Sequence, residues 1–341
     1  MNEKILTISI AAYNAAYCIE KCINSLIKSK YIDNLEIIVV DDGSSDNLEE
    51  VISTYLKNYD SIIYIKKENG GHGSTINTSI KRCTGKYFKI VDADDWVETD
   101  NLDKLVEYLK DNDEDLVINP YYQVNASNGE KLLKPAFKDN REIIHGTLND
   151  IYKDFFLQMH MMTFKSEVIK KMGPIISEKC FYVDSEYTIF PIRYINTVTC
   201  FNYPIYDYLI GTSVQSMDIK NLQKRRDQHL KVTKRLVNYY NDVKDDLNIY
   251  QKQLIYTRIC LMVSMQYCIY VSCNPKEIFN ELKEFDNWLK ENARNFYDDV
   301  FKVVKTFYPK RSYFLSIFRK INFFAYVPTT AFLQKLNLIK N

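Results

Sequence analysis

The sequence predicts an α/β fold in which a mostly parallel sheet is flanked by helices and followed by a helical C-terminal region. Two observations support this prediction. Short apolar segments alternate with helical patterns through the first half of the chain, and only helical patterns remain after Met217. The segment 37–40 reads Ile-Ile-Val-Val without polar alternation, which is typical of a parallel strand covered on both faces.

The alternation runs from the first strand to a helix that ends near residue 110. We expect strands at 5–12, 36–40, 62–66 and 87–91, and helices at 15–29, 48–56, 75–83 and 100–110. The pattern weakens at 119–149, where polar residues, Gly and Pro interrupt it, and clearer elements return at 155–172 and 185–194. The last third is expected to form helices at 222–240, 250–271 and 275–292, followed by a final aromatic segment.

The length of 341 residues exceeds that of one compact core of ordinary size. We therefore expect two units, 1–216 with the α/β domain and 217–341 with the helical region. The 45 Lys and Arg residues against 44 Asp and Glu residues leave a formal net charge of +1. The chain thus has no overall field that would favour nucleic acid, and we expect no nucleic-acid partner.

The cysteines and the apolar segments predict a cytoplasmic protein. The eight cysteines form no Cys-x-x-Cys pair and lie among apolar residues, which favours reduced thiols and argues against a sulfur-bound metal. The N-terminus leads into a short strand and lacks the long apolar region of a signal peptide. The segment 259–275 carries no formal charge but is shorter than the roughly 20 apolar residues of a spanning helix, so we expect a buried helix.

An acidic cluster follows the strand expected at 87–91. Asp92, Asp94 and Asp95 offer hard oxygen ligands that suit Mg²⁺ or Mn²⁺. In an extended segment Asp92 and Asp94 point to the same side, so these two are the better metal pair while Asp95 faces elsewhere. An acidic turn that caps the helix beginning near 99 would have the same composition, and the cluster alone leaves both interpretations open.

Two further segments lie at strand ends of the same sheet, where ligands bind in such folds. Asp41 and Asp42 end the second strand, and either accept a hydrogen bond from a base or ribose or belong to a turn that caps the next helix. The segment 68–74 holds three glycines that allow close approach of the backbone to a ligand. His72 in this loop either contacts a diphosphate or is an ordinary solvated histidine.

Two carboxylates lie in the apolar and aromatic stretch 181–187. A carboxylate in such surroundings can have its pKa raised toward the working range of a general base, which makes Asp184 and Glu186 candidates. The simpler alternative is that Asp184 caps the helix that follows and that Glu186 interacts favourably with the helix dipole.

Taken in order, these segments resemble the family-2 inverting glycosyltransferases of bacterial type, which have the GT-A fold. The resemblance rests on residues 9–14 (Ser-Ile-Ala-Ala-Tyr-Asn), 39–46 (Val-Val-Asp-Asp-Gly-Ser-Ser-Asp), 69–77 with its Asn-Gly-Gly loop, and 84–95, which lead into the acidic cluster. It is close over about the first hundred residues, weaker around Asp184 and absent over the helical tail. The sequence departs from the family's usual proline, arginine, glycine and the acidic residue that precedes the base at Ala11, Ile76, Ser79 and Val183.

The resemblance implies a UDP-sugar donor and a divalent cation, Mn²⁺ or Mg²⁺. It implies that the metal is held by Asp92 and Asp94, and that the donor is contacted by Ala12, Tyr13, Asp41, Asp42, Asn69, Gly70, Gly71, His72, Asp92 and Ala93. Asp184 matches the family's catalytic base, with Glu186 as the reserve candidate because Val183 replaces the preceding acidic residue. The acceptor hydroxyl, deprotonated by this base, would attack the anomeric carbon with inversion while the metal neutralises charge on the departing diphosphate.

The expected acceptor is a saccharide or a lipid-linked glycan, as in the assembly of cell-surface polysaccharide. No tryptophan follows Arg226, so the Gln-x-x-Arg-Trp element of processive synthases is missing and we expect single or limited additions. The basic and aromatic segment 310–326 either contacts the inner face of the plasma membrane or packs as a helix of the C-terminal region. Two alternatives stay open: a degenerate transferase domain that serves as a nucleotide-binding or scaffolding protein, and a nucleotidyltransferase that releases pyrophosphate.

Overall fold

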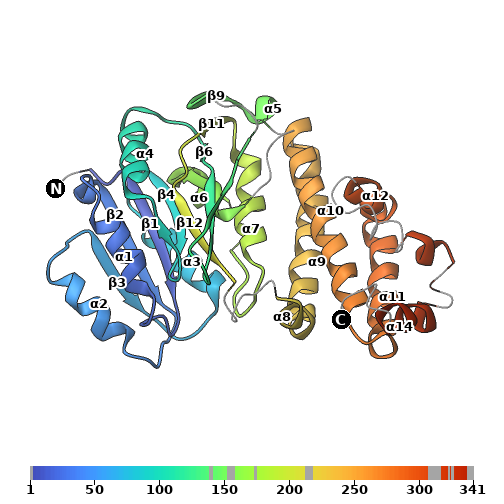
Figure 1. The fold of residues 1–341 in the computed structure, drawn as a ribbon. Helices are drawn as coiled ribbons and strands as arrows, with labels where there is room; N and C mark the ends of the chain where they lie inside the picture. The colour runs from blue at the N-terminus through green and yellow to red at the C-terminus, as the bar shows by residue number, and fades with distance from the viewer. Residues whose placement is uncertain are drawn as a thin grey trace. The chain divides into compact units, whose positions relative to one another are not determined.

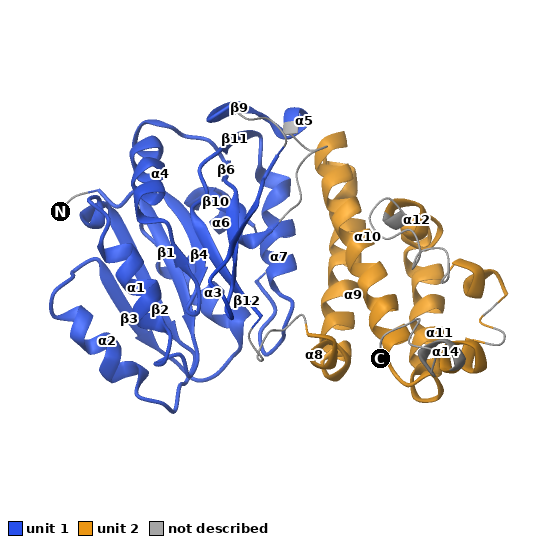
Figure 2. Cartoon of the chain, in the orientation of Figure 1, with its two compact units in different colours: residues 1–212 blue, residues 213–341 orange. Residues whose placement is uncertain are grey.

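The computed structural model describes residues 3–137, 141–151, 158–172, 175–211, 218–305, 316–321, 323 and 326–335. The chain divides into two compact units, Met1–Thr212 and Ser213–Asn341 (Figure 2). The boundary expected near 216 falls in 212–217, which lies outside the described residues, as do residues 155–157 of the element expected at 155–172.

The first unit is built on an eight-stranded sheet with the order β3-β2-β1-β4-β10-β6-β11-β9 (Figure 1). Its strands are β1 (Leu6–Ala12), β2 (Leu35–Asp41), β3 (Ile62–Lys66), β4 (Tyr87–Asp92), β6 (Leu116–Ile118), β9 (Ile143–Thr147), β10 (Met162–Lys165) and β11 (Thr197–Phe201). The strands β1 to β4 pair in parallel, whereas β10 pairs antiparallel with both β4 and β6. The sheet is therefore mixed, and the expected mostly parallel arrangement holds for β1 to β4. The antiparallel direction of β10 could not be predicted, because the apolar pattern of a strand does not depend on the direction in which it pairs.

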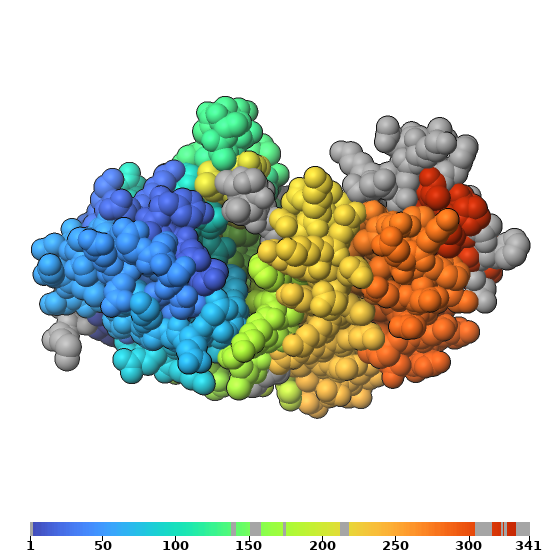
Figure 3. Space-filling view, turned by 90° about the horizontal axis from the view of Figure 1, so that it is seen from below, coloured from blue at the N-terminus to red at the C-terminus, as the bar shows by residue number. Residues whose placement is uncertain are grey.

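Helices pack against this sheet. They are α1 (Ile19–Ile27), α2 (Leu48–Leu56), α3 (His72–Arg82), α4 (Thr99–Asp111), α5 (Leu148–Ile151), α6 (Ser166–Lys171) and α7 (Asp184–Ile189), with 3₁₀ helices η1 (Ile32–Asn34), η2 (Met159–Met161) and η3 (Phe190–Tyr194). Helix α3 packs on β1 and β2, α2 on β3, and α6 on β4. All seven residues of β2 are buried, as its continuous apolar sequence predicts. Figure 3 shows the surface of this unit, on which the N-terminal residues, in blue to cyan, form one continuous area.

Two helices of this unit begin three or more residues from where they are expected. Helix α1 starts at Ile19 instead of 15, because the preceding residues form a turn in which the Cys18 amide donates to the Ala15 carbonyl at 3.1 Å. Helix α3 starts at His72 instead of 75. Gly71 precedes it with φ +79°, a left-handed value that favours glycine and lets the loop turn directly into the helix.

A second sheet has four strands in the order β5-β12-β7-β8. They are β5 (Trp96–Val97), β7 (Tyr121–Asn125), β8 (Lys131–Lys134) and β12 (Tyr206–Ile210). Strands β7 and β8 fall in the stretch where the sequence pattern weakens, and β8 is mostly exposed, so it lacks the apolar alternation by which strands are recognised. Strand β5 directly follows the acidic cluster and pairs antiparallel with β12.

The second unit is helical. Its helices are α8 (Ile219–Lys224), α9 (Arg226–Val243), α10 (Ile249–Ser272), α11 (Pro275–Asn292), α12 (Arg294–Lys305) and α14 (Tyr326–Lys335), with the 3₁₀ helix η4 (Lys244–Asp246). The single helix expected at 222–240 is two helices that break at Arg225. A capping box between Asn248 and Gln251 starts α10, and Asn274 caps α11 by accepting from the Lys276 amide.

Within the part of the chain that the structure describes, α10 is the one helix long and apolar enough to cross a membrane, with a mean hydropathy of 1.4 over its most apolar window. Of that window, 67% is buried inside the protein. Its buried residues include Gln266, whose Oε1 accepts a hydrogen bond from His229 Nδ1 at 2.6 Å. Helix α10 thus has the surroundings of a core helix, as expected for the segment 259–275.

The final aromatic segment is described at 316–321, 323 and 326–335. Phe318, Phe323 and Tyr326 are buried. The Tyr326 ring centroid lies 5.3 Å from that of Phe318 and 6.0 Å from that of Phe323. The described part of the segment therefore packs its aromatic rings against one another.

Candidate active site

The pair Asp41 and Asp42 and the acidic cluster lie at the ends of β2 and β4, the two strands on either side of β1. Ala12 at the end of β1 pairs with Asp41 in β2, and Ala11 pairs with Asp92 in β4. Because the three strands are parallel, their carboxyl ends meet at one edge of the sheet, where ligands bind in open α/β sheets. The Gly-rich loop follows β3 at the same edge. The structure thus brings together segments that the sequence placed separately at strand ends.

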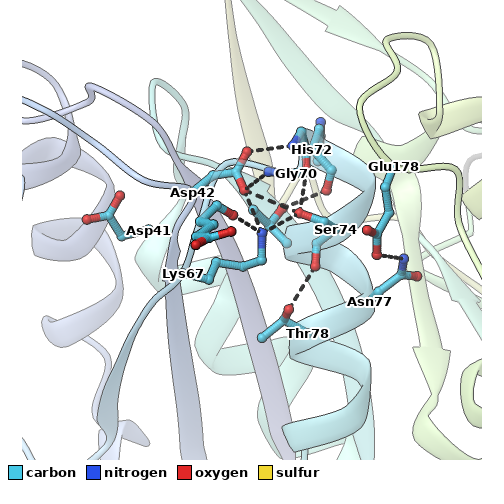
Figure 4. A network of polar contacts seen from close by, with 12 residues as sticks. Asp41, Asp42, Lys67, Gly70, His72, Ser74, Asn77, Thr78 and Glu178 are labelled. Atoms are coloured by element: carbon cyan, nitrogen blue, oxygen red, sulfur yellow. Dashed lines mark hydrogen bonds and ion pairs between the residues drawn. The ribbon is translucent and has the colours of Figure 1, made fainter.

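Asp42 organises the Gly-rich loop (Figure 4). Its Oδ1 accepts hydrogen bonds from Lys67 Nζ and the Gly70 amide, both at 2.9 Å, and its Oδ2 accepts from the Gly71 amide at 2.7 Å. Ser74 Oγ lies 3.2 Å from the same Oδ1. The side chain is only 5% exposed. Asp42 therefore holds the loop in place, and in this arrangement its oxygens are already engaged and are not offered to a base or ribose.

Asp41 is fully buried at the end of β2. Its Oδ1 accepts from the Ser44 amide at 2.7 Å, and its Oδ2 accepts from the Tyr64 hydroxyl at 2.6 Å. Burial raises the pKa of the Asp41 carboxyl, but the hydrogen bonds from Ser44 and Tyr64 outweigh burial and hold the pKa below its ordinary value. The carboxylate stabilises the turn after β2, which agrees with the turn interpretation of this segment.

The remaining expected donor contacts differ in exposure. Tyr13 is 56% exposed at the end of β1, whereas Ala12 and Ala93 are buried at 1% and 6%. Asn69 is exposed at the tip of the loop. Tyr13 and Asn69 are therefore side chains free to cover a ligand, while the two alanines offer mainly backbone atoms.

Asp95 is the anchor of the acidic cluster. It is 1% exposed, its Oδ2 accepts from the Tyr206 hydroxyl at 2.5 Å, and its Oδ1 accepts from the Leu209 amide at 2.8 Å. The Tyr206 hydroxyl also accepts from the Asp92 amide at 3.0 Å. Burial raises the pKa of Asp95 to about 9, and the nearby charges of Asp92 and Asp94 add to this effect. Strand β12 therefore holds the turn from Asp92 to Asp95 in place through hydrogen bonds.

Asp92 and Asp94 remain partly exposed, as the expected metal pair requires. Burial raises the pKa of Asp92 to about 6 against the opposing effect of His72, and burial also raises the pKa of Asp94. His72 Nε2 lies 3.8 Å from Asp92 Oδ1 and has no hydrogen-bond partner among the described residues. Carboxyl groups whose pKa values rise in this way lack a compensating positive charge, which a divalent cation would supply.

A histidine that sequence reasoning missed completes a group of metal-binding type. Asp92, Asp95 and His160 each bring one ligand atom within 4.8 Å of the other two. Burial lowers the pKa of His160 to about 3, so its imidazole is neutral, as a metal ligand must be. Its Nδ1 has no hydrogen-bond partner among the described residues. The expected ligand Asp94 is not part of this group. A lone histidine between methionines carries no ligand spacing that could have revealed it.

The ring of His160 packs in a tyrosine cluster. Its centroid lies 4.4 Å from that of Tyr208, 4.8 Å from that of Tyr206 and 5.2 Å from that of Tyr121. The backbone of His160 is also held, because its carbonyl accepts from Lys89 Nζ at 2.9 Å. The imidazole is therefore positioned from several sides beneath the acidic cluster.

Asp184 is the first residue of α7 and is partly exposed. Its charge is the smallest of the influences that raise the pKa of Asp92. The helix cap is Val183, and no side-chain hydrogen bond caps this end of α7. The capping alternative for Asp184 is therefore not what the structure shows.

The surroundings of Glu186 contradict its expected role as the reserve base. It is fully buried, and its two carboxylate oxygens accept from the Ser177 amide at 2.7 Å and from the Ser177 hydroxyl at 2.9 Å. A carboxylate that is enclosed and hydrogen-bonded in this way cannot reach an external hydroxyl. Glu186 fixes the segment before α7, and its role as reserve base is withdrawn.

The chain is similar to known glycosyltransferases in sequence and in fold. The model of glycosyl transferase family 2 matches residues 7–173. Glycosyltransferase GlyA of Streptococcus pneumoniae serotype 4 is 34% identical over 129 residues, which cover 38% of this chain and 18% of that protein. Poly(ribitol-phosphate) beta-glucosyltransferase of Bacillus spizizenii is 30% identical over 137 residues, which cover 39% of this chain and 21% of that protein. The chain thus spans about a fifth of the length of these two relatives.

A solved structure extends the similarity in fold beyond residues 7–173. S. aureus TarS 1-349, crystallised in complex with UDP-GlcNAc, superposes with a TM-score of 0.66 at 16% sequence identity, over 98% of this chain and 92% of that one. At this identity the likeness concerns the fold. Together with the acidic cluster and the Asn-Gly-Gly loop at one sheet edge, the family match identifies residues 7–173 of the chain as a glycosyl transferase family 2 domain.

Proposed function

We propose that this chain is an inverting glycosyltransferase that moves a sugar from a UDP-sugar to a hydroxyl group of a saccharide or lipid-linked glycan, in single or limited additions. The observation that supports the proposal is the position of Asp92 and Asp94 at the same sheet edge as the Gly-rich loop, in a family 2 domain. The UDP-GlcNAc in the TarS complex supports a UDP-sugar donor. The similarity to a poly(ribitol-phosphate) beta-glucosyltransferase supports a polymeric acceptor, as in the assembly of cell-surface polysaccharide. The reaction would take place in the cytoplasm or at the inner face of the plasma membrane.

The donor side of the proposal uses the edge residues of β1, β4 and α3. Asp92 and Asp94 would hold Mn²⁺ or Mg²⁺, with His160 and Asp95 beneath them. When bound, such a cation neutralises the negative charge that develops on the leaving diphosphate. His72 at the start of α3 would contact the diphosphate, where the helix N-terminus also favours anions.

The acceptor side of the proposal uses Asp184. Its carboxylate would accept the proton of the acceptor hydroxyl while that oxygen forms its bond to the anomeric carbon. The bond from the anomeric carbon to the diphosphate oxygen breaks on the opposite side, so the configuration inverts. With Glu186 buried and bonded to Ser177, the partly exposed Asp184 at the start of α7 is the carboxylate that we assign to this role.

The test is UDP release from a panel of UDP-sugars with Mn²⁺, with and without saccharide acceptors. We expect Asp94→Asn and Asp184→Asn to lower turnover by about 10²-fold or more, because a metal ligand or a general base is lost. Asp60→Asn is the control, since Asp60 is exposed in the turn before β3. Its turnover should equal that of the unchanged protein.

Three results would contradict the proposal. Full activity of Asp184→Asn would remove Asp184 from the mechanism. Tight, metal-dependent UDP binding without turnover of any donor would indicate a nucleotide-binding or scaffolding protein. Release of pyrophosphate would indicate a nucleotidyltransferase.

A further inference from the structure

The segment 176–182, which leads into the helix of Asp184, lies directly on the Gly-rich loop. The Lys179 amide donates to the Gly70 carbonyl at 2.5 Å. A Cβ added at Gly71 would lie 3.1 Å from the Lys179 nitrogen, a tight contact with backbone. The absence of a side chain at position 71 therefore allows the close approach of this segment to the loop.

Asn77 of α3 holds the start of the segment (Figure 4). Its Oδ1 accepts from the Ile176 amide at 3.0 Å, and its Nδ2 donates to the Ile176 carbonyl at 2.9 Å. The same Nδ2 donates to Glu178 Oε1 at 3.1 Å. Asn77 is only 7% exposed. One side chain thus bonds to both backbone groups of a residue 99 positions later, and it does so from the helix that begins in the Gly-rich loop.

Glu186 of α7 holds the same segment. Its two oxygens accept from the amide and the hydroxyl of Ser177. Since Ser177 directly follows Ile176, two neighbouring residues are bonded to α3 and to α7. Glu186 is fully buried, and a hydrogen bond away from water is electrostatically stronger than one in water. The segment 176–182 therefore connects the helix of the Gly-rich loop with the helix that begins at Asp184.

The backbone between these bonds and Asp184 contains two left-handed residues. Lys179 has φ +50° and Tyr182 has φ +67°. Residues with a Cβ rarely adopt this conformation, and it persists where the surrounding structure holds it. Asp184 follows Lys179 by five residues, which span roughly 18 Å at most when fully extended. The position of Asp184 relative to the Gly-rich loop therefore depends on the bonds made by Asn77 and Glu186.

We propose that Asn77 and Glu186 are positioning residues for Asp184. They hold the segment 176–182 on the Gly-rich loop, so that Asp184 keeps a fixed place relative to a donor bound at that loop. The role of Asp184 as the base rests on the proposed function. A displacement of about 1 Å at a reacting group can lower the rate by about 10²-fold. Loss of these bonds therefore lowers turnover, while Asp42 still holds the Gly-rich loop for the donor.

Asn77→Ala tests the proposal, and Thr78→Ala is the matched control. Thr78 is the next residue of α3, and its hydroxyl donates to the Ser74 carbonyl within that helix. We expect Asn77→Ala to lower kcat for sugar transfer by about tenfold or more. The KM of the donor and the Kd of UDP with Mn²⁺ should change by less than about threefold. In the Asp184→Asn background, Asn77→Ala should cause no further loss, because its effect passes through the base.

Hydrogen–deuterium exchange tests the same bonds without turnover. In Asn77→Ala the amides of residues 176–182 should exchange about tenfold faster or more, while those of β1 stay protected. Thr78→Ala should exchange like the unchanged protein. Glu186→Gln repeats the test from α7, because its amide group has one acceptor oxygen in place of two. If one of these two variants fails to fold, the other still decides.

Four results would contradict the inference or the function on which it rests. Faster exchange with unchanged kcat in Asn77→Ala would show that the segment does not position the base. A loss of kcat that multiplies with that of Asp184→Asn, or a tenfold weaker binding of UDP with unchanged kcat, would give Asn77 another role. Equal exchange in Asn77→Ala and Thr78→Ala would show that Asn77 does not hold the segment. If the unchanged protein turns over no donor, the proposed function fails, and faster exchange in Asn77→Ala still supports the hold on the segment.

Discussion

The three carboxylates of the acidic cluster differ in what surrounds them. Asp92 and Asp94 are partly exposed at the sheet edge, whereas Asp95 is buried and bonded to Tyr206 and Leu209. An alternating extended segment would place Asp92 and Asp94 on one side, as expected from sequence. The cluster therefore contains two carboxylates open to a ligand and one that fixes their position.

Removal of the Tyr206 hydroxyl tests this anchor. Tyr206→Phe removes one hydrogen-bond donor from the buried Asp95 carboxyl group, so we expect the free energy of unfolding to fall by about 1–3 kcal/mol. Mn²⁺ binding should weaken as well, because the turn from Asp92 to Asp95 loses its support. Thermal unfolding and Mn²⁺ titration measure the two effects. Tyr208→Phe is the matched control, since the Tyr208 ring packs on His160 in the same cluster. Equal losses in both variants would argue against the anchor.

The raised pKa of Asp95 predicts a pH dependence of stability. Between its ordinary pKa of 3.8 and its folded value of about 9, Asp95 keeps a proton in the folded state that the unfolded chain releases. Its stabilising contribution is therefore complete below the ordinary pKa and is lost as the pH rises through this window. Asp95→Asn cannot titrate, so its melting temperature should fall less across the window than that of the unchanged protein. The melting temperatures are to be measured in the presence of a chelator. An equal fall in melting temperature for Asp95→Asn and the unchanged protein would contradict the raised pKa of Asp95.

At the scale of elements, the start of α3 depends on a close approach. A Cβ added at Gly73 would lie 2.0 Å from the Ser177 carbonyl oxygen. This oxygen belongs to the backbone, which cannot move aside as easily as the end of a flexible side chain. We expect Gly73→Ala to lower the free energy of unfolding by about 1–3 kcal/mol or more. UDP binding should weaken too, because His72 moves with the helix. Denaturant unfolding and UDP titration measure both. Thr78→Ala in the same helix is the control, and its free energy of unfolding should change by no more than about 0.5 kcal/mol. An equally small change for Gly73→Ala would contradict the close packing at Gly73.

Element boundaries were predictable where the cause is local. The capping box that starts α10 lies within four neighbouring residues, and the helix expected at 250–271 is found at Ile249–Ser272. The break at Arg225 was not predicted, because it does not interrupt the apolar periodicity of the segment. The exposed strand β8 was not predicted, because it has no apolar alternation. Local chemistry thus locates a helix end better than it locates an edge strand.

At the scale of the whole molecule, each compact unit has its own buried core. The first contains both sheets with their helices, and the second surrounds the apolar α10 with helices. We expect residues 1–212 expressed alone to unfold in one cooperative transition and to bind UDP with Mn²⁺. Circular dichroism melting and UDP titration would check this, with the full chain as control. A fragment without a cooperative transition would show that the first unit needs the helical unit for its stability.

The eight cysteines are thiols, as their scattered positions predict. The sequence by itself determined the alternation of strands and helices, the helical last third and the resemblance to the family, because these follow from apolar periods and from motifs of neighbouring residues. It also placed the acidic cluster and the Gly-rich loop at strand ends, since parallel strands bring their ends to one edge.

Only the tertiary structure decided which side chains of these motifs are open to a ligand. Asp95 is held by Tyr206, 111 residues away, and Asp42 by a loop beginning 25 residues later, so neither role is visible in its own segment. The same is true of His160, which joins Asp92 and Asp95 from a segment without a motif, and of Glu186, which turns inward to Ser177. Burial and hydrogen bonding between distant residues set the charge and the access of each carboxylate, and a local pattern carries neither.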